Sequence, residues 1–248
     1  MARKTGYAFW RFLIFKKVTR ASEKKKLNVP HSAWSGGRVV GIVDSPEALT
    51  KSLKLTSRDM DYLEWRADFM GSDLPDSRLP WVVTARHPAE GGQNAMNAAQ
   101  RRDTLLQMLP KASIVDVEVR SLPGMKKVVD AARSQGVQVA CSFHDFQKTP
   151  TTQRLKEVID RAADSGANAV KIATMTRFPS DIARLLDLWS HSSLPLALMG
   201  MGPLGMASRL LFANCGSVLN YGWLHQPNVP GQWSAWELKA LVIKSAVI

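Results

Sequence analysis

One lysine lies in the middle of an otherwise apolar segment of the chain. Lys171 stands between Val170 and Ile172, a pattern typical of a buried β-strand. Burial and nearby cations favour the neutral amine of a lysine, the form that attacks a carbonyl carbon and gives an imine. The candidate cations are Arg66, Arg86 and Arg209. The alternative is a lysine that forms an ion pair with Glu118 or with another acid at a strand end.

A histidine follows the preceding apolar run. His144 comes directly after Cys141–Phe143 and before Asp145, so its ring is expected at the rim of the strand next to that of Lys171. A histidine near the ordinary pKa of about 6.5 can remove a proton alpha to an iminium carbon and return it later. The alternative is a rim histidine that is held by a carboxylate.

Other polar side chains stand where further apolar runs end. They are Glu64 and Arg66, then Arg86, then Asp116 and Glu118. Arg209 lies one turn into a helix that follows the glycine-bearing turn Gly202–Gly205. Such a turn can present backbone N–H groups and a guanidinium to an anion, and a phosphate or a carboxylate would fit equally well.

Short strands that alternate with helices would bring these residues together. The expected strands are Val39–Val43, Asp61–Trp65, Trp81–Ala85, Ile114–Val117, Gln138–Phe143, Ala169–Ala173, Pro195–Met199 and Ser217–Tyr221. The expected helices are Pro46–Leu55, Asn94–Leu109, Leu122–Gln135, Thr151–Ser165, Pro179–His191, Pro203–Asn214 and one from Ser234 to the end of the sequence. Gly136 and Gly166 stand where helices should end, and Phe69–Pro80 is too short and turn-rich for a full helix.

This alternation predicts the α/β class and a (β/α)8 TIM barrel, whose chemistry sits at the C-terminal ends of the strands. A doubly wound open sheet is the alternative. The first expected strand is not followed by G-x-G-x-x-G, which disfavours the dinucleotide-binding form of that alternative.

The basic charge of the chain is concentrated near its start. The 248 residues hold 33 Lys and Arg against 21 Asp and Glu, a net charge of +12 that invites a nucleic-acid interpretation. Nine of the basic residues and one acidic residue lie in residues 1–37, so this segment carries +8 and the remainder +4. We therefore predict a basic N-terminal arm, residues 1–37, that is disordered, and a single catalytic barrel, residues 38–248, with no nucleic-acid partner.

The arm contains the short apolar stretch Tyr7–Phe15, interrupted by Arg11. The stretch is too short to span a bilayer, and the basic run Lys24–Lys26 stands where a signal peptide would have small residues. A solvated tail is favoured over a segment that touches an anionic membrane surface and over an upstream start that adds non-native residues. We expect a cytoplasmic protein in which Cys141 and Cys215 are buried free thiols, and no Cys or His spacing supports a metal site.

Taken together, the strand-end residues resemble the type I 3-dehydroquinate dehydratases, the Schiff-base enzymes of the shikimate pathway. The match runs in order from about Val39 to Gln232. Its motifs are Glu64–Asp68 (like the family's E-x-R-x-D), Thr84–Arg86 with Glu90–Gly92 (T-x-R…E-G-G), Asp116–Glu118 (D-x-E), Ser142–Phe146 with Thr149–Pro150, Val170–Ala173, Met199–Gly200 through Ser208–Arg209, Gly216–Ser217 and Pro230–Gln232. Each motif alone is weak, but eight in register are a strong signal.

The resemblance implies a lyase that removes water from 3-dehydroquinate to give 3-dehydroshikimate, with no metal or organic cofactor. In the family, the position that matches Lys171 forms an imine with the C3 ketone. The position that matches His144 takes the C2 proton and helps the C1 hydroxyl to leave, and the position that matches Glu90 orients this histidine. The other matches bind substrate: Glu64, Arg66 and Arg86 around its hydroxyls, Arg209 on its carboxylate, Gln232 and Asn228 in a covering loop, and Met199, Met201 and Tyr221 in an apolar wall.

The chain departs from the family pattern at three positions. Asn228 stands where a serine is usual, and Trp65 and Asn220 stand where smaller or different residues are common. We expect these departures to bear on substrate grip and turnover. Because the family is commonly dimeric, the expected partners are a homodimer mate and the small-molecule substrate.

Two alternatives to the dehydratase remain. One is a class I aldolase-type Schiff-base enzyme on the same fold, although Arg209 with Gln232 suits a carboxylated ring better than a phosphorylated sugar. The other is a catalytically altered or non-catalytic relative that binds a related cyclic carboxylate. A sensor has no need to keep both Lys171 and His144, which favours the enzyme.

Overall fold

The computed structural model describes residue 34, residues 36–93 and residues 95–246. The strands are β1 (Arg38–Val43), β2 (Tyr62–Arg66), β3 (Trp81–Thr84), β4 (Ala112–Glu118), β5 (Gln138–Asp145), β6 (Ala169–Met175), β7 (Leu196–Met201) and β8 (Leu219–Trp223). The helices are α2 (Pro46–Ser52), α3 (Ala67–Met70), α4 (Ala98–Met108), α5 (Leu122–Ser134), α6 (Thr152–Asp164), α7 (Pro179–His191), α8 (Gly205–Asn214) and α9 (Ala235–Ala246). Short 3-10 turns are η1 (Pro88–Glu90), η2 (Leu109–Lys111) and η3 (Val119–Ser121).

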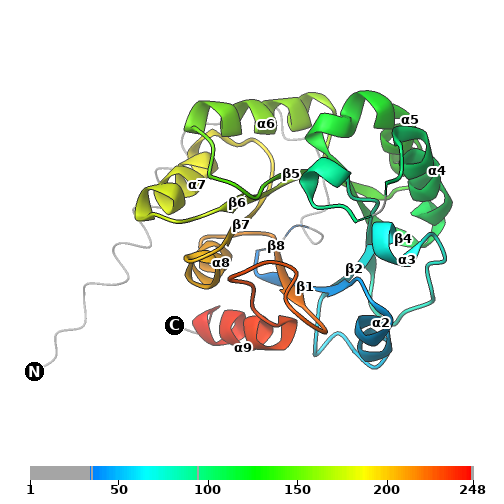
Figure 1. Ribbon diagram of the computed structural model, residues 1–248, viewed down its shortest axis with the longest axis horizontal. Helices are drawn as coiled ribbons and strands as arrows, with labels where there is room; N and C mark the ends of the chain where they lie inside the picture. The colour runs from blue at the N-terminus through cyan, green and yellow to red at the C-terminus, as the bar shows by residue number, and fades with distance from the viewer. Residues whose placement is uncertain (1–33, 35, 94, 247–248) are drawn as a thin grey trace, which may run out of the picture. The chain divides into compact units, whose positions relative to one another are not determined.

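The strands form one parallel sheet in the order β7-β6-β5-β4-β3-β2-β1-β8, and helices surround it (Figure 1). At the seam between β7 and β8, the backbone N–H of Val218 donates to the Leu196 carbonyl at 3.0 Å. The Ser217 hydroxyl accepts from the N–H of Leu198 at 3.1 Å, so Ser217 bridges the seam and β8 itself begins at Leu219. The predicted (β/α)8 TIM barrel is confirmed.

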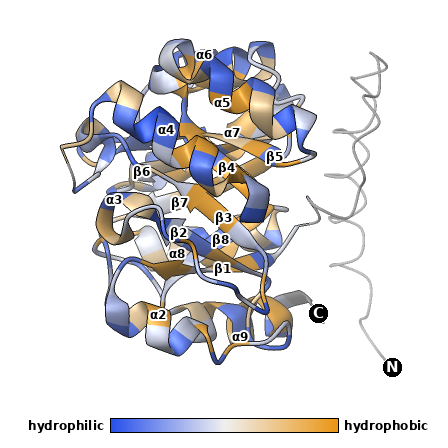
Figure 2. Cartoon of the chain, turned by 90° about the vertical axis from the view of Figure 1, so that its right-hand side faces the viewer, coloured by the Kyte–Doolittle hydropathy of each residue, from blue (hydrophilic) through white to orange (hydrophobic). Residues whose placement is uncertain are grey.

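Successive side chains along each strand point alternately into the apolar layer under the helices and into the inside of the barrel. Alternate residues such as Val170 and Ile172 of β6 pack into the apolar layer between strands and helices, while Lys171 between them points into the barrel. The same alternation on β2 buries Leu63 in that apolar layer and directs Glu64 inward. Figure 2 shows the strands largely in hydrophobic colours, with hydrophilic residues on the helices around them. The polar centre of the barrel is therefore set by strand periodicity.

Several helix ends are set by residues close to them in the sequence. Gly136 and Gly166 both have φ of 73°, the left-handed conformation that ends α5 and α6 as predicted. Helix α4 begins at Ala98 rather than at residue 94, because Asn97 forms a capping box with Gln100. The turn-rich segment between β2 and β3 holds only the short helix α3.

Trp34 and the two cysteines differ in how far they are buried. Trp34, assigned to the arm, is buried and its indole donates to Gln138 at 3.2 Å, while residues 1–33 and 35 lie outside the described residues. Cys141 is buried as predicted, but the prediction for Cys215 was wrong, because it lies at the exposed end of α8. Every helix among the described residues is too short or too polar to cross a lipid bilayer.

Candidate active site

A cavity of about 210 Å³ lies at the C-terminal ends of the barrel strands. All the residues predicted for the site line it: Glu64, Arg66, Arg86, Glu90, His144, Lys171, Met199, Met201, Arg209, Tyr221, Asn228 and Gln232. They come from β2, from the segment after β3, from β5, β6 and β7, from α8, and from β8 and the segment that follows it. The structure thus brings them together in one place.

Lys171 is 3% exposed and is surrounded by groups that stabilise an ammonium. Its Nζ donates to Glu64 Oε1 at 2.8 Å and to Asp116 Oδ2 at 2.9 Å. The same atom lies 3.8 Å from the centroid of the Tyr221 ring, a cation–π contact. The expected cations Arg66, Arg86 and Arg209 line the same cavity, and Arg86 shares Asp116 Oδ2 with Lys171. The carboxylates that bind Lys171 are Glu64 and Asp116, so Glu118 as the named alternative partner was wrong.

Asp116 is a site residue that the sequence analysis placed at a strand end but to which it assigned no role. It is 1% exposed, and its Oδ2 accepts from both Lys171 and Arg86. Burial alone would raise the pKa of Asp116, but Lys171 and Arg86 outweigh burial and hold the pKa below its ordinary value. The available signal was the D-x-E spacing, because residues two apart on a strand point to the same side as each other.

His144 lies in a fixed tautomer. Arg86 Nη1 lies 2.6 Å from His144 Nε2, and a guanidinium only donates, so Nε2 is the unprotonated nitrogen. Nδ1 then carries the proton and donates to Glu90 Oε2 at 2.9 Å, and the backbone N–H of His144 donates to the same oxygen at 3.0 Å. Burial, then the charges of Arg86, Lys171 and Arg66, hold the pKa of His144 well below 6.5. The expected ordinary pKa was wrong, and the ring is a neutral base.

Glu90 is buried at the end of η1, with 3% of its surface exposed. Burial raises the pKa of Glu90 to about 7, the charge of Glu118 adds to the rise, and Arg86 opposes it. The raised pKa of Glu90 and the lowered pKa of His144 therefore favour the neutral form of each group near neutral pH.

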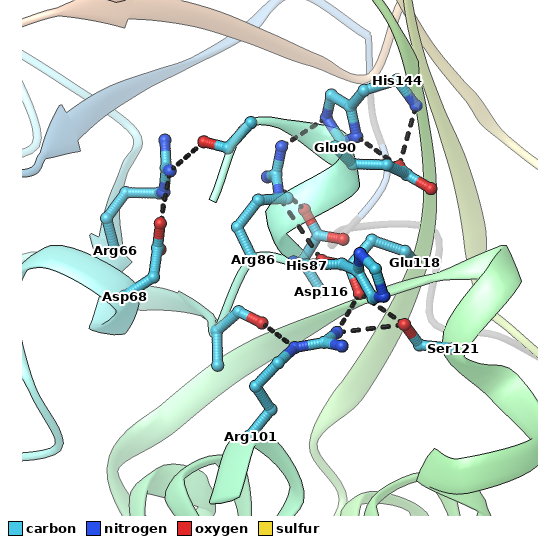
Figure 3. Close-up of polar contacts among 12 residues, drawn as sticks. Arg66, Asp68, Arg86, His87, Glu90, Arg101, Asp116, Glu118, Ser121 and His144 are labelled. Carbon is cyan, nitrogen blue, oxygen red and sulfur yellow. Dashed lines mark hydrogen bonds and ion pairs between the residues drawn. The ribbon is translucent and has the colours of Figure 1, made fainter. Parts of the chain in front are cut away.

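Arg86 connects the histidine to the lysine. Besides His144, it contacts Asp116 through Nη2 at 3.3 Å and Glu118 through Nε at 3.6 Å. Burial lowers the pKa of Arg86, yet Asp116, Glu64 and Glu118 together outweigh burial and raise it. In Figure 3 the guanidinium of Arg86 lies between His144 and Asp116.

Arg209 is held in a different way. It is 3% exposed, and its Nε and Nη1 donate to the carbonyls of Gly200 at 3.0 Å and Tyr221 at 2.8 Å. No carboxylate in the described part of the chain forms an ion pair with it, and burial lowers its pKa to about 10. A buried guanidinium beside the cavity without an acid partner is suited to an anionic ligand.

The glycine-bearing turn before α8 does not offer its amides to the cavity. Gly202 N–H donates to the Pro230 carbonyl at 2.8 Å, and Gly205 N–H donates to the Gly202 carbonyl at 2.9 Å. A Cβ on Gly231 would lie 2.2 Å from the Gly202 oxygen, so glycine is required for this close packing. The prediction of a backbone anion site in the turn was wrong, and Arg209 is the cation that this region supplies to the cavity.

The covering segment after β8 is tied to the end of the neighbouring strand β1. The Asn228 side chain donates to Asp44, which follows β1. The Asn228 backbone N–H donates to Gln232 Oε1 at 2.9 Å. Burial raises the pKa of Asp44, and the hydrogen bond from Asn228 opposes that rise. Asn228 therefore serves as a tether in this state.

The other two departures do not line the cavity. Trp65 points into the outer apolar layer, where its indole donates to the Gly71 carbonyl at 2.8 Å. The Asn220 side chain donates to the carbonyls of Arg38 and Ser217 at 3.2 and 3.0 Å. Both residues support the barrel wall, so any effect of them on substrate grip or turnover would be indirect.

Comparison with known proteins places the chain in one family. A family model described as type I 3-dehydroquinase matches residues 40–245. The 3-dehydroquinate dehydratase of Methanocella arvoryzae is 31% identical over 203 residues, 79% of this chain and 90% of that protein. The 3-dehydroquinate dehydratase of Bacillus licheniformis is 31% identical over 208 residues, 74% and 81% of the two chains. The type I enzyme of Clostridium difficile, solved with covalently modified comenic acid, shares the fold: TM-score 0.78, 23% identity, 92% of this chain and 100% of that one.

The barrel, with a buried lysine between carboxylates and a histidine–glutamate pair beside it, defines a barrel lyase of the imine-forming kind. The extent of the family match and the identity to curated relatives make the assignment definite: the chain belongs to the type I 3-dehydroquinase family. The activity that goes with membership is that of a hydro-lyase, the dehydration of 3-dehydroquinate in the shikimate pathway.

Proposed function

We propose that this chain dehydrates 3-dehydroquinate through an imine at Lys171, with His144 as general base and general acid and Glu90 as the residue that orients it. The observation that carries the proposal is the placement of Lys171 Nζ between two buried carboxylates, in the cavity that His144 also lines. A protonated imine withdraws electrons from the neighbouring carbon and makes its proton easier to remove.

Activation of Lys171 requires loss of a proton before its nitrogen attacks the C3 carbonyl. Glu64 Oε1 and Asp116 Oδ2 already accept hydrogen bonds from Nζ, so each is in place to receive that proton. The carbonyl oxygen leaves as water when the carbinolamine collapses to the iminium. That oxygen takes one proton from the attacking nitrogen and a second that either carboxylate can return to it.

The proton transfers at C2 and C1 fall to His144. Its Nε2 is unprotonated but accepts from Arg86, so substrate must displace this contact before Nε2 can reach the C2 proton. Nδ1–H remains bound to Glu90, which keeps the ring in one orientation and stabilises the imidazolium that forms. The same Nε2–H then protonates the C1 hydroxyl as it leaves, which restores the neutral ring.

Arg209 is proposed to bind the ring carboxylate, because it is the buried cation whose contacts in the described residues are all carbonyls. Gln232 and Asn228 are proposed to cover the substrate, with Met199, Met201 and Tyr221 as its apolar wall, and Glu64, Arg66 and Arg86 around its hydroxyls. A ligand with one carboxylate on an uncharged ring fits these contacts better than a phosphorylated sugar does. The homodimer, the cytoplasmic location and the arm as a disordered tail stay predictions.

The test is chemical trapping. Incubation with 3-dehydroquinate and sodium borohydride should leave a reduced adduct on the peptide that contains Lys171, detected by mass spectrometry. Lys171→Ala should lose the adduct and at least about 10⁴-fold in kcat, as removal of a covalent nucleophile does. Lys148, an exposed lysine outside the cavity, provides the matched control, and Lys148→Ala should behave as the wild type.

A wild-type protein that turns over substrate without an adduct, or a Lys171→Ala variant that keeps its activity, would overturn the proposal. A screen with phosphorylated sugars separates the aldolase alternative, which requires an adduct with a sugar phosphate and none with 3-dehydroquinate.

A further inference from the structure

A buried arginine outside the cavity makes an unusual set of contacts. Arg101 lies in the first turn of α4 and is 2% exposed, and it does not line the cavity. Its Nε donates to the Ala85 carbonyl at 2.7 Å. Its Nη2 donates to Glu118 Oε2 and, at 3.0 Å, to the Ser121 hydroxyl. The planar fork of the guanidinium thus joins three elements: the end of β3, the end of β4 and η3.

Glu118 is the centre of this arrangement. It is 1% exposed, and its Oε2 also accepts from the Ser121 hydroxyl at 3.0 Å. Its Oε1 accepts from the backbone N–H of His87 at 2.7 Å and lies 3.6 Å from Arg86 Nε. A carboxylate removed from water needs such partners, because its charge is costly to bury alone.

These contacts bracket Arg86 on both sides along the chain. The carbonyl before it, of Ala85, is bound by Arg101, and the N–H after it, of His87, is bound by Glu118. The His87 carbonyl in turn accepts from the N–H of Glu90 at 2.8 Å. Figure 3 shows the sequence of contacts from Arg101 through Glu118 and Arg86 to His144. The backbone that carries both Arg86 and Glu90 is therefore anchored by the Arg101–Glu118 pair.

The pair also acts electrostatically. Without Arg101, Arg86 would be the remaining cation within ion-pair distance of Glu118 among the described residues, and its Nε is already at 3.6 Å. We expect Arg86 to move towards Glu118 in that case, away from His144 and Asp116. Burial is the largest cause of the raised pKa of Glu90, and the charge of Glu118 is the second. If Arg101 no longer neutralised Glu118, we would expect the pKa of Glu90 to rise further.

We propose that Arg101 is a positioning residue for the dehydration reaction, one that holds Arg86 and Glu90 in place for His144 by binding Ala85 and neutralising Glu118. This inference rests on the proposed function of His144 and Glu90. It assigns no contact between Arg101 and substrate.

The first variant is Arg101→Met, which keeps an unbranched apolar stem and removes the fork. Misplacement of catalytic groups by about 1 Å can cost about 100-fold in rate, and we expect a fall of that order in kcat with KM little changed. The pH profile of kcat should shift, because the His144 and Glu90 pair loses its fixed surroundings. The borohydride adduct on Lys171 should still form, since Lys171 keeps Glu64 and Asp116.

Two further variants keep the test decisive if Arg101→Met folds poorly. Arg101→Met combined with Glu118→Gln removes the buried charge together with its partner, and it should recover folding and most of the pH profile. Arg101→Lys keeps the charge but cannot bind Ala85, Glu118 and Ser121 at once, so it should fold and lose rate to an intermediate degree.

The matched control is Arg161→Met. Arg161 lies at an exposed position of α6 and donates to the carbonyl of Val119 at 3.1 Å. Val119 directly follows Glu118 in the sequence. It should leave kcat and its pH profile unchanged.

The inference is overturned if folded Arg101→Met or Arg101→Lys matches Arg161→Met in kcat and pH profile. It is also overturned if the double variant folds but does not recover the pH profile, or if kcat of Arg101→Met falls only in proportion to the folded fraction. A failure of the proposed function is distinguishable, because in that case the wild type itself forms no adduct on Lys171.

Discussion

Two of the buried cations that line the cavity are held in opposite ways. Lys171, on β6, contacts two carboxylates, Glu64 and Asp116, that come from strands distant in sequence. Arg209, on α8, contacts only the carbonyls of Gly200 and Tyr221. Both side chains are 3% exposed, so the difference lies in their partners rather than in burial.

This difference corresponds to the two tasks proposed for them. A nucleophile that must exchange a proton benefits from acceptors that are already in contact with it. A group that binds an anion benefits from having its charge left unneutralised, because a ligand carboxylate can then supply the missing partner. The site is electrostatically complete around Lys171 and incomplete around Arg209 until substrate binds.

The largest effect expected from this comparison is on stability. Lys171→Met leaves Glu64 and Asp116 buried with one fewer cation, and we expect the free energy of unfolding to fall by about 3–5 kcal/mol. Arg209→Met deprives two carbonyls of donors, at about 1–3 kcal/mol each, but it also removes a buried charge that has no acid partner. The loss for Arg209→Met should therefore be less than half of that for Lys171→Met, as measured by urea unfolding at pH 7 without ligand.

Adding Asp116→Asn to Lys171→Met should restore part of the lost stability, because it removes one of the unpaired charges. Equal losses for the two single variants, or a larger loss for Arg209→Met, would contradict the contrast between the two cations.

A second, smaller effect concerns the dependence of stability on pH. Because burial, then Glu118, raises the pKa of Glu90 from 4.5 to about 7, the folded protein retains a proton between these pH values that the unfolded chain releases. The contribution of Glu90 to stability is therefore favourable at low pH and is lost as pH rises towards 7. Above pH 7 the ionised carboxyl costs on the order of 3 kcal/mol.

Glu90→Gln removes this cost. Relative to the wild type, the variant should gain stability as pH rises from 4.5 to 7 and then stay level up to pH 8, measured by urea unfolding at each pH. His144 has the opposite sign, since its lowered pKa costs stability below about pH 6.5 in both proteins. A constant difference between the two proteins across this range would show that Glu90 titrates normally.

The smallest effect is expected at the covering segment on the Arg209 side. Asn228→Ala breaks the contact with Asp44, and the loss of one exposed hydrogen bond is worth about 1 kcal/mol, or roughly fivefold in kcat/KM. Asn214→Ala, which removes an exposed helical amide bound to Leu210, is the control and should leave kcat/KM unchanged. A loss comparable to that of Arg209→Met would place Asn228 in direct contact with substrate instead.

Local patterns were sufficient to predict the architecture. The alternation of β-branched runs with helices, and the terminal glycines Gly136 and Gly166, depend on neighbours in sequence, so they predicted the barrel and most element ends. The shifted start of β8 could not be predicted this way, because Ser217 is used to bridge the seam to β7. The buried Trp34 was missed for the same reason, since its partner Gln138 is 104 residues away.

The sequence by itself determined which side chains point into the barrel, because strand periodicity places Glu64, Asp116, His144 and Lys171 on inward positions. Only the tertiary structure decided which of them pair. The partners of Lys171 are 107 and 55 residues away, and the pKa of His144 is lowered by burial and by the charges of Arg86, Lys171 and Arg66. Desolvation and charge–charge energies depend on distance in space, and distance in space is a property of the closed barrel rather than of any one segment.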